Sequence, residues 1–181
     1  FPEILPILES ASVVVGSNLK FDLHWLRREL NATVPCVWDC QLAEFILSKQ
    51  QWKYPDLATM CDNYDVQRKI DVVKLEYWDK GIDTDAIPFE ILAEYGAGDV
   101  ESTYQVFLKQ LARFEGDDNG MFKLFRLHCN DLLVLQEMEY NGIMYDVAAS
   151  LEQSKSLEKQ IARLEELIYV YTNGVPINLD S

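Results

Sequence analysis

The sequence predicts an α/β fold in which two short strands alternate with helices and are followed by longer helices. Two compact runs near the N-terminus, residues 11–16 and 34–38, are rich in β-branched side chains, as buried strands are. Each run is followed by apolar residues at helical spacing. This alternation favours a parallel pair of strands covered by helices.

The first strand is expected between two helices. A short helix is predicted over residues 2–9, and the strand over residues 11–16 ends at a glycine. Ser17 or Asn18 then follows as the cap of the next helix. The apolar positions of that helix fall at i, i+4, i+7 and i+11, the spacing of one helix face: Leu19, Leu23, Leu26 and Leu30.

The second strand is followed by Asp39, which is expected to cap a helix through residues 42–47. Residues 52–87 are predicted to be loop-rich with short helices, because proline and glycine interrupt them. A long helix is expected over residues 88–114, and the glycine- and aspartate-rich residues 116–120 form a turn or linker after it.

The C-terminal part is predicted to be helical. A helix over residues 121–140 stops at Asn141-Gly142, and residues 143–145 form a short extended piece. The last helix has apolar residues at alternating spacings of four and three, the pattern of a seam that packs against a neighbouring helix: Leu157, Ile161, Leu164, Ile168 and Tyr171.

The charge of the chain is strongly acidic. Among 181 residues, 16 are Lys or Arg and 30 are Asp or Glu, so the formal net charge is −14. Nucleic-acid binders usually present a basic surface, so DNA binding would need metal ions or a basic surface elsewhere in a longer protein. No apolar run approaches the roughly 18 residues that span a bilayer, and no membrane partner is expected.

The cysteines do not indicate a zinc site. Cys36 and Cys40 are four residues apart, but no second Cys/His pair follows at ligand spacing. Reduced thiols of a cytoplasmic protein are expected instead. The chain begins at Phe1 without a signal peptide pattern and is expected to be a fragment cut at both ends.

Asn18 and Asp22 form the first candidate motif. They lie four residues apart at the start of a predicted helix, so they share one edge of it. Asp22 falls at the border of the leucine face and is expected to point toward the sheet. The alternative is a plain first-turn acid that the positive end of the helix dipole favours.

Tyr95 and Asp99 form the second candidate motif, one turn apart inside the long predicted helix. Gly96 and Gly98 lie between them, and each costs a helix interior about 1 kcal/mol relative to alanine. Close approach of this turn to a ligand or another backbone would offset that cost. A helix crossing that needs small residues explains the glycines equally well.

Together the motifs favour metal-assisted chemistry. Hydrolysis of a phosphodiester by two metal ions needs carboxylates from different elements around cations about 3.5–4 Å apart. Mg²⁺ and Mn²⁺ prefer carboxylate oxygens. Asp22 and Asp99 are of this type, and Tyr95 lies where it could hold an attacking water.

The two motifs also resemble those of a known family. Asn18 to Asp22 (NLKFD) resembles the second motif, and Tyr95-x3-Asp99 the third motif, of DEDDy-type 3′→5′ exonucleases. The surrounding sequence resembles the proofreading domain of bacterial and phage family A (DNA polymerase I-like) polymerases, most clearly in VVVGSNLKFDLHWL and YGAGDVESTYQVFLKQL. Downstream, LLVLQEMEYNGIMYDVAAS resembles the start of the polymerase domain, so the resemblance covers nearly the whole chain.

The resemblance implies specific roles. Asp22 and Asp99 match metal ligands of the catalytic site, for two Mg²⁺ (or Mn²⁺) ions in the intact domain, and Tyr95 matches the tyrosine that orients water. Asn18 matches a residue that contacts the substrate near its 3′ end. Phe21 stands where relatives often have another aromatic residue, which suggests a role in packing or in holding the terminal nucleotide. The expected partner is DNA, bound as a single-stranded 3′ end and as a primer-template. A processivity partner is possible, and its identity is unknown.

The resemblance further implies a ribonuclease-H-like α/β exonuclease fold that lacks its N-terminal strands (residues 1–115), followed by the α-helical start of a polymerase thumb (residues 121–181). The parent would be a DNA polymerase that proofreads by excising 3′ nucleotides. The family's first motif, Asp-x-Glu, is absent from this sequence, so the fragment alone is expected to be inactive. A stand-alone exoribonuclease of the same superfamily and a non-catalytic scaffold are the alternatives.

Overall fold

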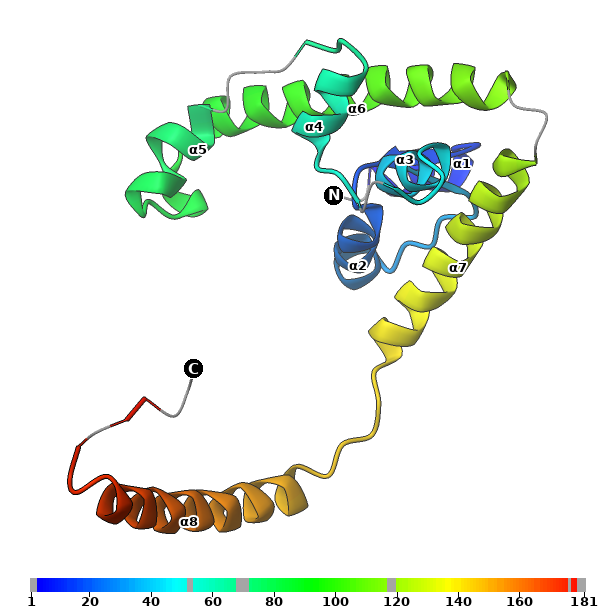
Figure 1. Ribbon diagram of the computed structural model, residues 1–181. Helices are drawn as coiled ribbons and strands as arrows, with labels where there is room; N and C mark the ends of the chain where they lie inside the picture. Colours follow the sequence, from blue (N-terminus) through cyan, green and yellow to red (C-terminus); the bar gives the residue numbers. More distant parts are fainter. Residues whose placement is uncertain (1–2, 52–53, 68–71, 117–119, 176, 179–181) are drawn as a thin grey trace. The chain divides into compact units, whose positions relative to one another are not determined.

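The computed structural model describes residues 3–51, 54–67, 72–116, 120–175 and 177–178, and the structural statements below concern these. They form two compact units, Phe1–Asn141 and Gly142–Ser181. The first unit is a mixed α/β unit, mostly helical with a small parallel sheet (Figure 1). Its elements are α1 (Leu5–Ser10), β1 (Val14–Gly16), α2 (Leu19–Leu30), β2 (Val37–Asp39), α3 (Cys40–Leu47), α4 (Leu57–Asn63), α5 (Val72–Glu76), η1 (Trp78–Lys80), η2 (Thr84–Ala86), α6 (Phe89–Glu115) and α7 (Met121–Asn141).

The sheet joins β1 and β2 in parallel, with α2 as the crossover between them. Val14 lies opposite Val37, and Gly16 lies opposite Asp39. Both strands are shorter than predicted. The ladder begins just beyond Pro35, which has no amide proton to donate, where the Val14 amide donates to the Cys36 carbonyl at 2.9 Å.

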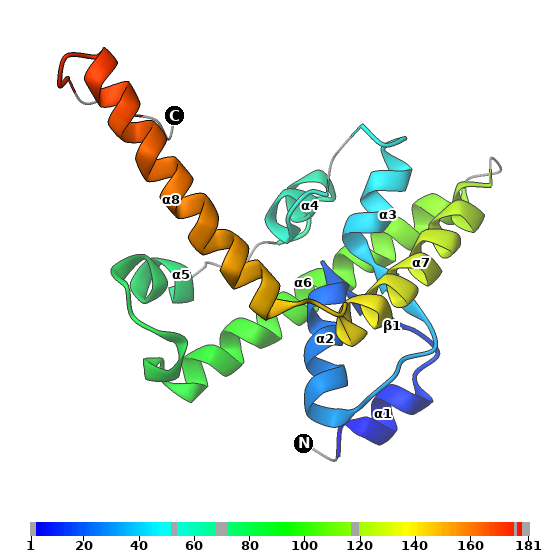
Figure 2. The ribbon, with the colours of Figure 1, turned by 90° about the horizontal axis from the view of Figure 1, so that it is seen from below.

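Helices α6 and α7 pack around α3 and the two strands, α6 against β1 and α7 against β2 (Figures 1 and 2). The core is centred on Trp38, which is 4% exposed. Its ring lies 4.6 Å from that of Phe125 on α7, and 4.9 Å and 5.6 Å from those of Phe107 and Phe114 on α6, measured between centroids. One aromatic residue of the sheet thus holds both long helices.

A buried polar network lies beside this aromatic cluster. Glu44 on α3 is fully buried, and its carboxylate accepts hydrogen bonds from the Tyr64 hydroxyl at 2.5 Å and from Gln110 Nε2 at 3.2 Å. Gln110 Oε1 in turn accepts from the indole N–H of Trp38 at 3.2 Å. Arg113 donates to the Tyr64 hydroxyl at 2.7 Å. The network therefore connects β2, α3 and α6 with the residue that follows α4.

Helix α7 belongs to the first unit, although the sequence placed a domain boundary before it. Phe125, Cys129 and Leu132 are buried against the core, and α7 contacts α2, α3 and β2. The compact units divide after Asn141, and not at residues 116–120, because the apolar face of α7 completes the core. Part of that predicted linker, residues 117–119, lies outside the described residues. The assignment of residues 121–181 to a polymerase domain stays a prediction.

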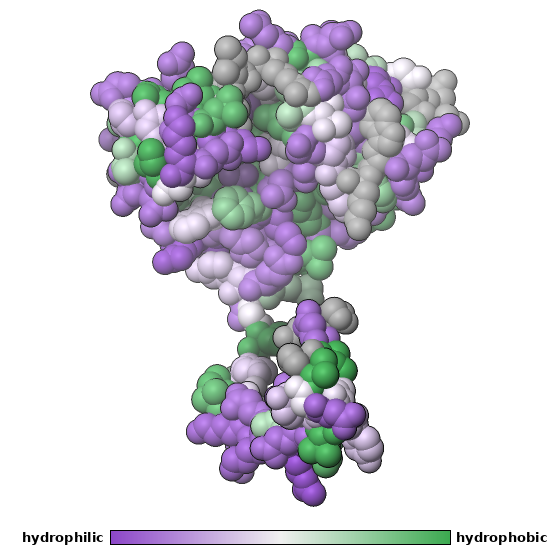
Figure 3. Space-filling model, turned by 60° about the vertical axis from the view of Figure 1, so that its left-hand side comes forward, coloured by the Kyte–Doolittle hydropathy of each residue, from purple (hydrophilic) through white to green (hydrophobic). Residues whose placement is uncertain are grey.

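The second unit is built around α8 (Val147–Tyr171). Asp146 caps this helix by accepting a hydrogen bond from the Ala149 amide at 2.9 Å. None of its residues is buried, and the predicted apolar seam is exposed; Figure 3 shows hydrophobic residues on the surface of this unit. Residues 143–145 form no strand and are exposed. No helix of the described chain is apolar over a stretch long enough to cross a membrane.

Candidate active site

A cavity of about 1090 Å³ lies in the first unit, where β1 ends and α2 begins. Residues of β1, α2, α4, α5, η1 and α6 line it. Asp22, Tyr95 and Asp99 are all among them, although more than 70 residues of chain separate Asp22 from the other two. The structure therefore brings these three predicted residues to one cavity.

Asp22 is placed by the tight connection between β1 and α2. This connection is close-packed at Gly16, because a Cβ there would lie too close to Leu19 Cδ1 and the leucine side chain would have to shift. The Asp22 side chain remains accessible to solvent, yet the surrounding protein raises the pKa of its carboxyl by desolvation. A backbone hydrogen bond works in the opposite direction, and the nearby negative charge of Asp39 adds a smaller upward shift in pKa. Such a carboxylate would be stabilised by a cation.

Asp39 holds the geometry of the site and does not line the cavity. Its Oδ2 accepts from the Leu19 amide at 2.7 Å, and its Oδ1 accepts from the amides of Gln41 at 2.8 Å and Leu42 at 3.1 Å. Burial raises the pKa of the Asp39 carboxyl, although these backbone hydrogen bonds lower it. The predicted role of Asp39 as a helix cap is confirmed, and the carboxylate also caps α2.

Tyr95 and Asp99 lie one turn apart on α6, and each is partly buried. The Tyr95 ring meets that of Trp78 edge to face, with centroids 5.7 Å apart. Trp78 is in turn held by a 3.1 Å hydrogen bond from its indole N–H to the Thr84 hydroxyl. The segment that follows α5 thus supports the tyrosine on the cavity wall.

Asn18 and Phe21 do not line the cavity. Asn18 adopts a left-handed conformation (φ 57°) and makes no side-chain cap, so the predicted cap by Ser17 or Asn18 is replaced by Asp39. Phe21 is 61% exposed and packs edge-on against Trp25. The predicted contact of Asn18 and Phe21 with substrate therefore stays a prediction.

The expected close approach at the glycines is not found at Gly96. A Cβ added there would meet nothing within 4 Å. Its place one residue after Tyr95 is therefore not explained by crowding in this structure.

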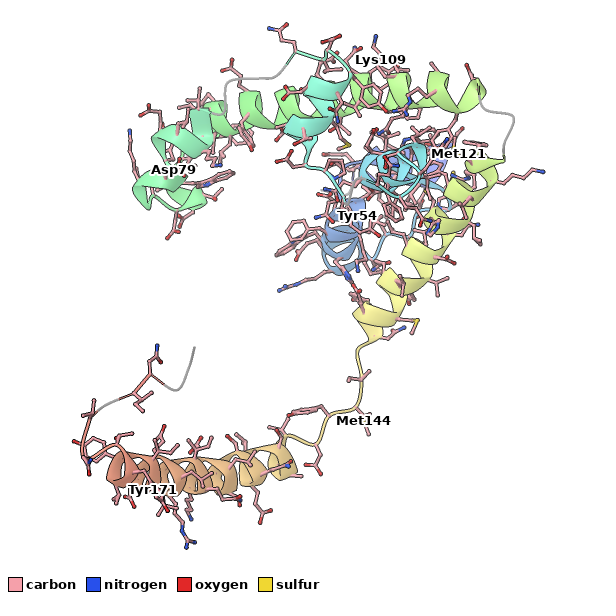
Figure 4. The ribbon with its side chains drawn as sticks, viewed as in Figure 1. Tyr54, Asp79, Lys109, Met121, Met144 and Tyr171 are labelled. Carbon is pink, nitrogen blue, oxygen red and sulfur yellow. The ribbon has the colours of Figure 1, made fainter. Side chains whose placement is uncertain are left out.

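Other cavity residues were not predicted. Lys74 on α5 and Asp79 on η1 join Asp56 and Tyr104 on the cavity wall, and Asp79 is labelled in Figure 4. No spacing in the sequence indicates them, because they lie in the loop-rich middle or on a helix face that packing alone defines. They add one basic and two acidic groups to the cavity.

The donor set fits a hard cation in part. Asp22 and Asp99 supply carboxylate oxygens from two separate helices to one cavity, as Mg²⁺ or Mn²⁺ would require. Across the described residues, however, no three His, Cys, Asp or Glu side chains gather closely enough to hold a metal ion. Two carboxylates therefore form an incomplete ligand set for such an ion.

These features describe an α/β unit in which two helices direct carboxylates into one acidic cavity. Residues 3–113 match the protein family described as 3'-5' exonuclease. The chain therefore belongs to the exonuclease domains of family A DNA polymerases. A DNA polymerase of Bacillus phage SP01 is 28% identical over 167 residues, which cover 89% of this chain and 18% of that relative. The chain thus spans less than a fifth of the curated relative's length. No solved structure matches the chain significantly.

Proposed function

We propose that this chain is the proofreading part of a DNA-directed DNA polymerase and hydrolyses the terminal phosphodiester at the 3′ end of DNA. The convergence of Asp22, Tyr95 and Asp99 on one cavity supports this most directly. The family match and the similarity to a phage DNA polymerase agree with it. The proposal includes a ribonuclease-H-like fold for the complete domain and a thumb beginning within residues 121–181.

In this proposal Asp22 and Asp99 would hold two divalent cations together with carboxylates of an upstream Asp-x-Glu motif. The cations would polarise the phosphodiester and stabilise the charge that develops on its oxygens. The Tyr95 hydroxyl orients the attacking water in line with the scissile bond. The water oxygen bonds to phosphorus, the 3′ oxygen of the preceding nucleotide departs and takes up a proton, and a nucleoside 5′-monophosphate is released.

Asn18 and Phe21 complete the proposed site on the substrate side. Both belong to the turn and first helical residues that lead to Asp22, so they would contact the last nucleotides from the rim of the cavity. Their positions outside its lining are compatible with contact to a strand that enters the cavity. The single-stranded 3′ end is the proposed substrate.

The test uses the parent polymerase. Asp99→Ala should abolish release of 3′ mononucleotides and leave nucleotide incorporation nearly unchanged, while Tyr95→Phe should reduce release less because both metal ligands remain. Asp131→Asn, an exposed change on α7, is the matched control and should alter neither activity. Loss of incorporation with Asp99→Ala, or full exonuclease activity in that variant, would contradict the proposal. A parent without an upstream Asp-x-Glu would favour the scaffold alternative.

A further inference from the structure

Two large aromatic side chains and an arginine form an exposed stripe on α2. Phe21 is 61% and Trp25 is 49% exposed, and their rings meet edge-on with centroids 6.4 Å apart. The guanidinium carbon of Arg28 lies 5.5 Å from the centre of the Trp25 ring. Spacings of four and three residues place all three on one side of the helix. We name this set the α2 stripe.

The other faces of α2 have partners within the first unit. Leu19 and Leu23 are buried in the core. Lys20 and His24 face α7, where they contact the carboxylate of Glu139 at 2.6 Å and 3.0 Å. The α2 stripe thus remains exposed on a helix that is fixed on both its core and its α7 side.

The α2 stripe adjoins the side of the helix that lines the cavity. Asp22 and Leu26 are the α2 residues of the cavity wall beyond its first residue. At about 100° per residue, Trp25 lies about 60° around the helix axis from Asp22, and Phe21 about 100° from it. A strand whose end occupies the cavity beside Asp22 can therefore continue over the rings of the α2 stripe.

The local charge also suits a nucleic-acid strand. Helix α2 contains three cations (Lys20, Arg27, Arg28) and two acids (Asp22, Glu29), so its formal charge is 3 − 2 = +1, whereas that of the chain is −14. Arg28 is well exposed and contacts only the neighbouring Glu29 among the ion pairs of the described chain, at 3.4 Å. Phosphates would find a cation here on an otherwise acidic protein.

We propose that Trp25 and Arg28, together with Phe21, form a stacking platform for the nucleotides that precede the 3′ end of single-stranded DNA. This inference rests on the proposed function and adds a binding site outside the catalytic cavity. Aromatic rings that accept bases and a nearby cation that attracts the backbone are the two components of sequence-tolerant single-strand binding. The Trp25 ring supplies the first component and Arg28 the second.

The test measures binding of an oligothymidylate of about eight nucleotides to the 181-residue chain at low salt. Trp25→Ala should weaken binding about tenfold, Trp25→Phe should largely retain it, and Arg28→Gln should weaken it and flatten its salt dependence. Phe89→Ala removes an aromatic side chain that is 78% exposed on α6, and Arg163→Gln removes a cation on α8; neither should change the affinity. Thermal unfolding checks that each variant folds. If Trp25→Ala does not fold, the binding measured for Arg28→Gln tests the platform by itself.

A second ligand separates this inference from the proposed function. Thymidine 5′-monophosphate with Mn²⁺ is small enough to occupy the cavity alone, and Asp99→Ala should abolish its binding whereas Trp25→Ala should not. Mononucleotide binding that depends on Asp99, combined with oligonucleotide binding that ignores Trp25 and Arg28, would overturn the platform and leave the proposed function standing. The reverse pattern would support the platform and count against the cavity as a nuclease site. A chain that binds no oligonucleotide at all would also overturn the platform.

Discussion

The carboxylate of Asp39 accepts a hydrogen bond of 2.7 Å from the amide of Leu19, and so the residue that caps α3 also caps α2. The parallel register that sets Gly16 opposite Asp39 brings the start of α2 to this carboxylate. The helix of Asp22 is thereby fixed to the second strand through one buried side chain.

Asp39→Ala should therefore destabilise the first unit more than loss of an ordinary cap. It removes acceptors from three backbone amides, and we expect a loss of about 3 kcal/mol in the free energy of unfolding. Asp56→Ala is the matched comparison: Asp56 caps α4 by accepting a hydrogen bond from the Thr59 amide, and loss of this ordinary cap should cost about 1 kcal/mol. Urea unfolding of both variants measures the difference. Equal losses would mean that the double cap does not form in solution.

Asp22→Asn should stabilise the fold at neutral pH. Partial desolvation raises the pKa of the Asp22 carboxyl in the folded chain above its usual value of about 3.9, so ionisation of Asp22 opposes folding. The stability that Asp22 contributes is complete below about pH 4 and is lost as the pH rises through the raised pKa. The variant should therefore melt at a higher temperature than the wild type at pH 7, and this gain should vanish below about pH 4.

Added Mn²⁺ provides the complementary measurement. It should raise the melting temperature of the wild-type chain and leave that of Asp22→Asn unchanged, because binding to the folded state alone stabilises it. Asp131→Asn, the exposed change on α7, is the control. It should have the melting temperature of the wild type at pH 7, and Mn²⁺ should raise that temperature as it does for the wild type. A wild-type chain that is indifferent to Mn²⁺ would argue that two carboxylates do not suffice for binding.

Truncation should locate the structural boundary after α7. A chain of residues 1–141 should unfold cooperatively at the same temperature as the first unit of the full chain. A chain of residues 1–116 lacks Phe125, which is fully buried beside Trp38, and should show no cooperative transition. Near-ultraviolet circular dichroism during thermal unfolding distinguishes these outcomes. A cooperative 1–116 would restore the boundary expected at residues 116–120.

Tyr64→Phe should weaken the packing of α3 against α6. Burial, and then the hydrogen bond to Glu44, raise the pKa of the Tyr64 hydroxyl, which stays protonated and donates to the buried carboxylate. Its removal should cost about 1–3 kcal/mol in the free energy of unfolding, since Glu44 loses a donor away from water. In a double-mutant cycle, Glu44→Gln should make the effect of Tyr64→Phe much smaller. Additive effects of the two changes would show that the hydrogen bond contributes little.

The order of elements could be predicted because each depends on local sequence. The helix after Asp39 and the long helix that begins after Pro88 both appear within a residue or two of their expected starts. The cap of α2 could not be predicted, because its acceptor lies 20 residues away and depends on strand register. The packing of α7 on the first unit could not be predicted for a similar reason: the turn before α7 is a strong local signal, whereas the contact of Phe125 with Trp38 is not encoded locally.

The candidate site shows the same division. Asp22, Tyr95 and Asp99 could be singled out from short motifs, and the structure adds that they share a cavity. Lys74 and Asp79 reach that cavity only because short helices fold back over α6, and no periodicity in the sequence encodes this return.

Helix α8 has no buried side chain among its described residues, so tertiary packing within this chain does little to protect its backbone amides. We expect those amides to exchange with deuterium at rates set by local fraying, while amides of α3 exchange only when the first unit opens as a whole. Slower exchange along Leu157, Ile161 and Leu164 in the parent polymerase would then show that neighbouring segments of the parent stabilise this helix. The ratio of the two exchange rates would give the free energy of that stabilisation.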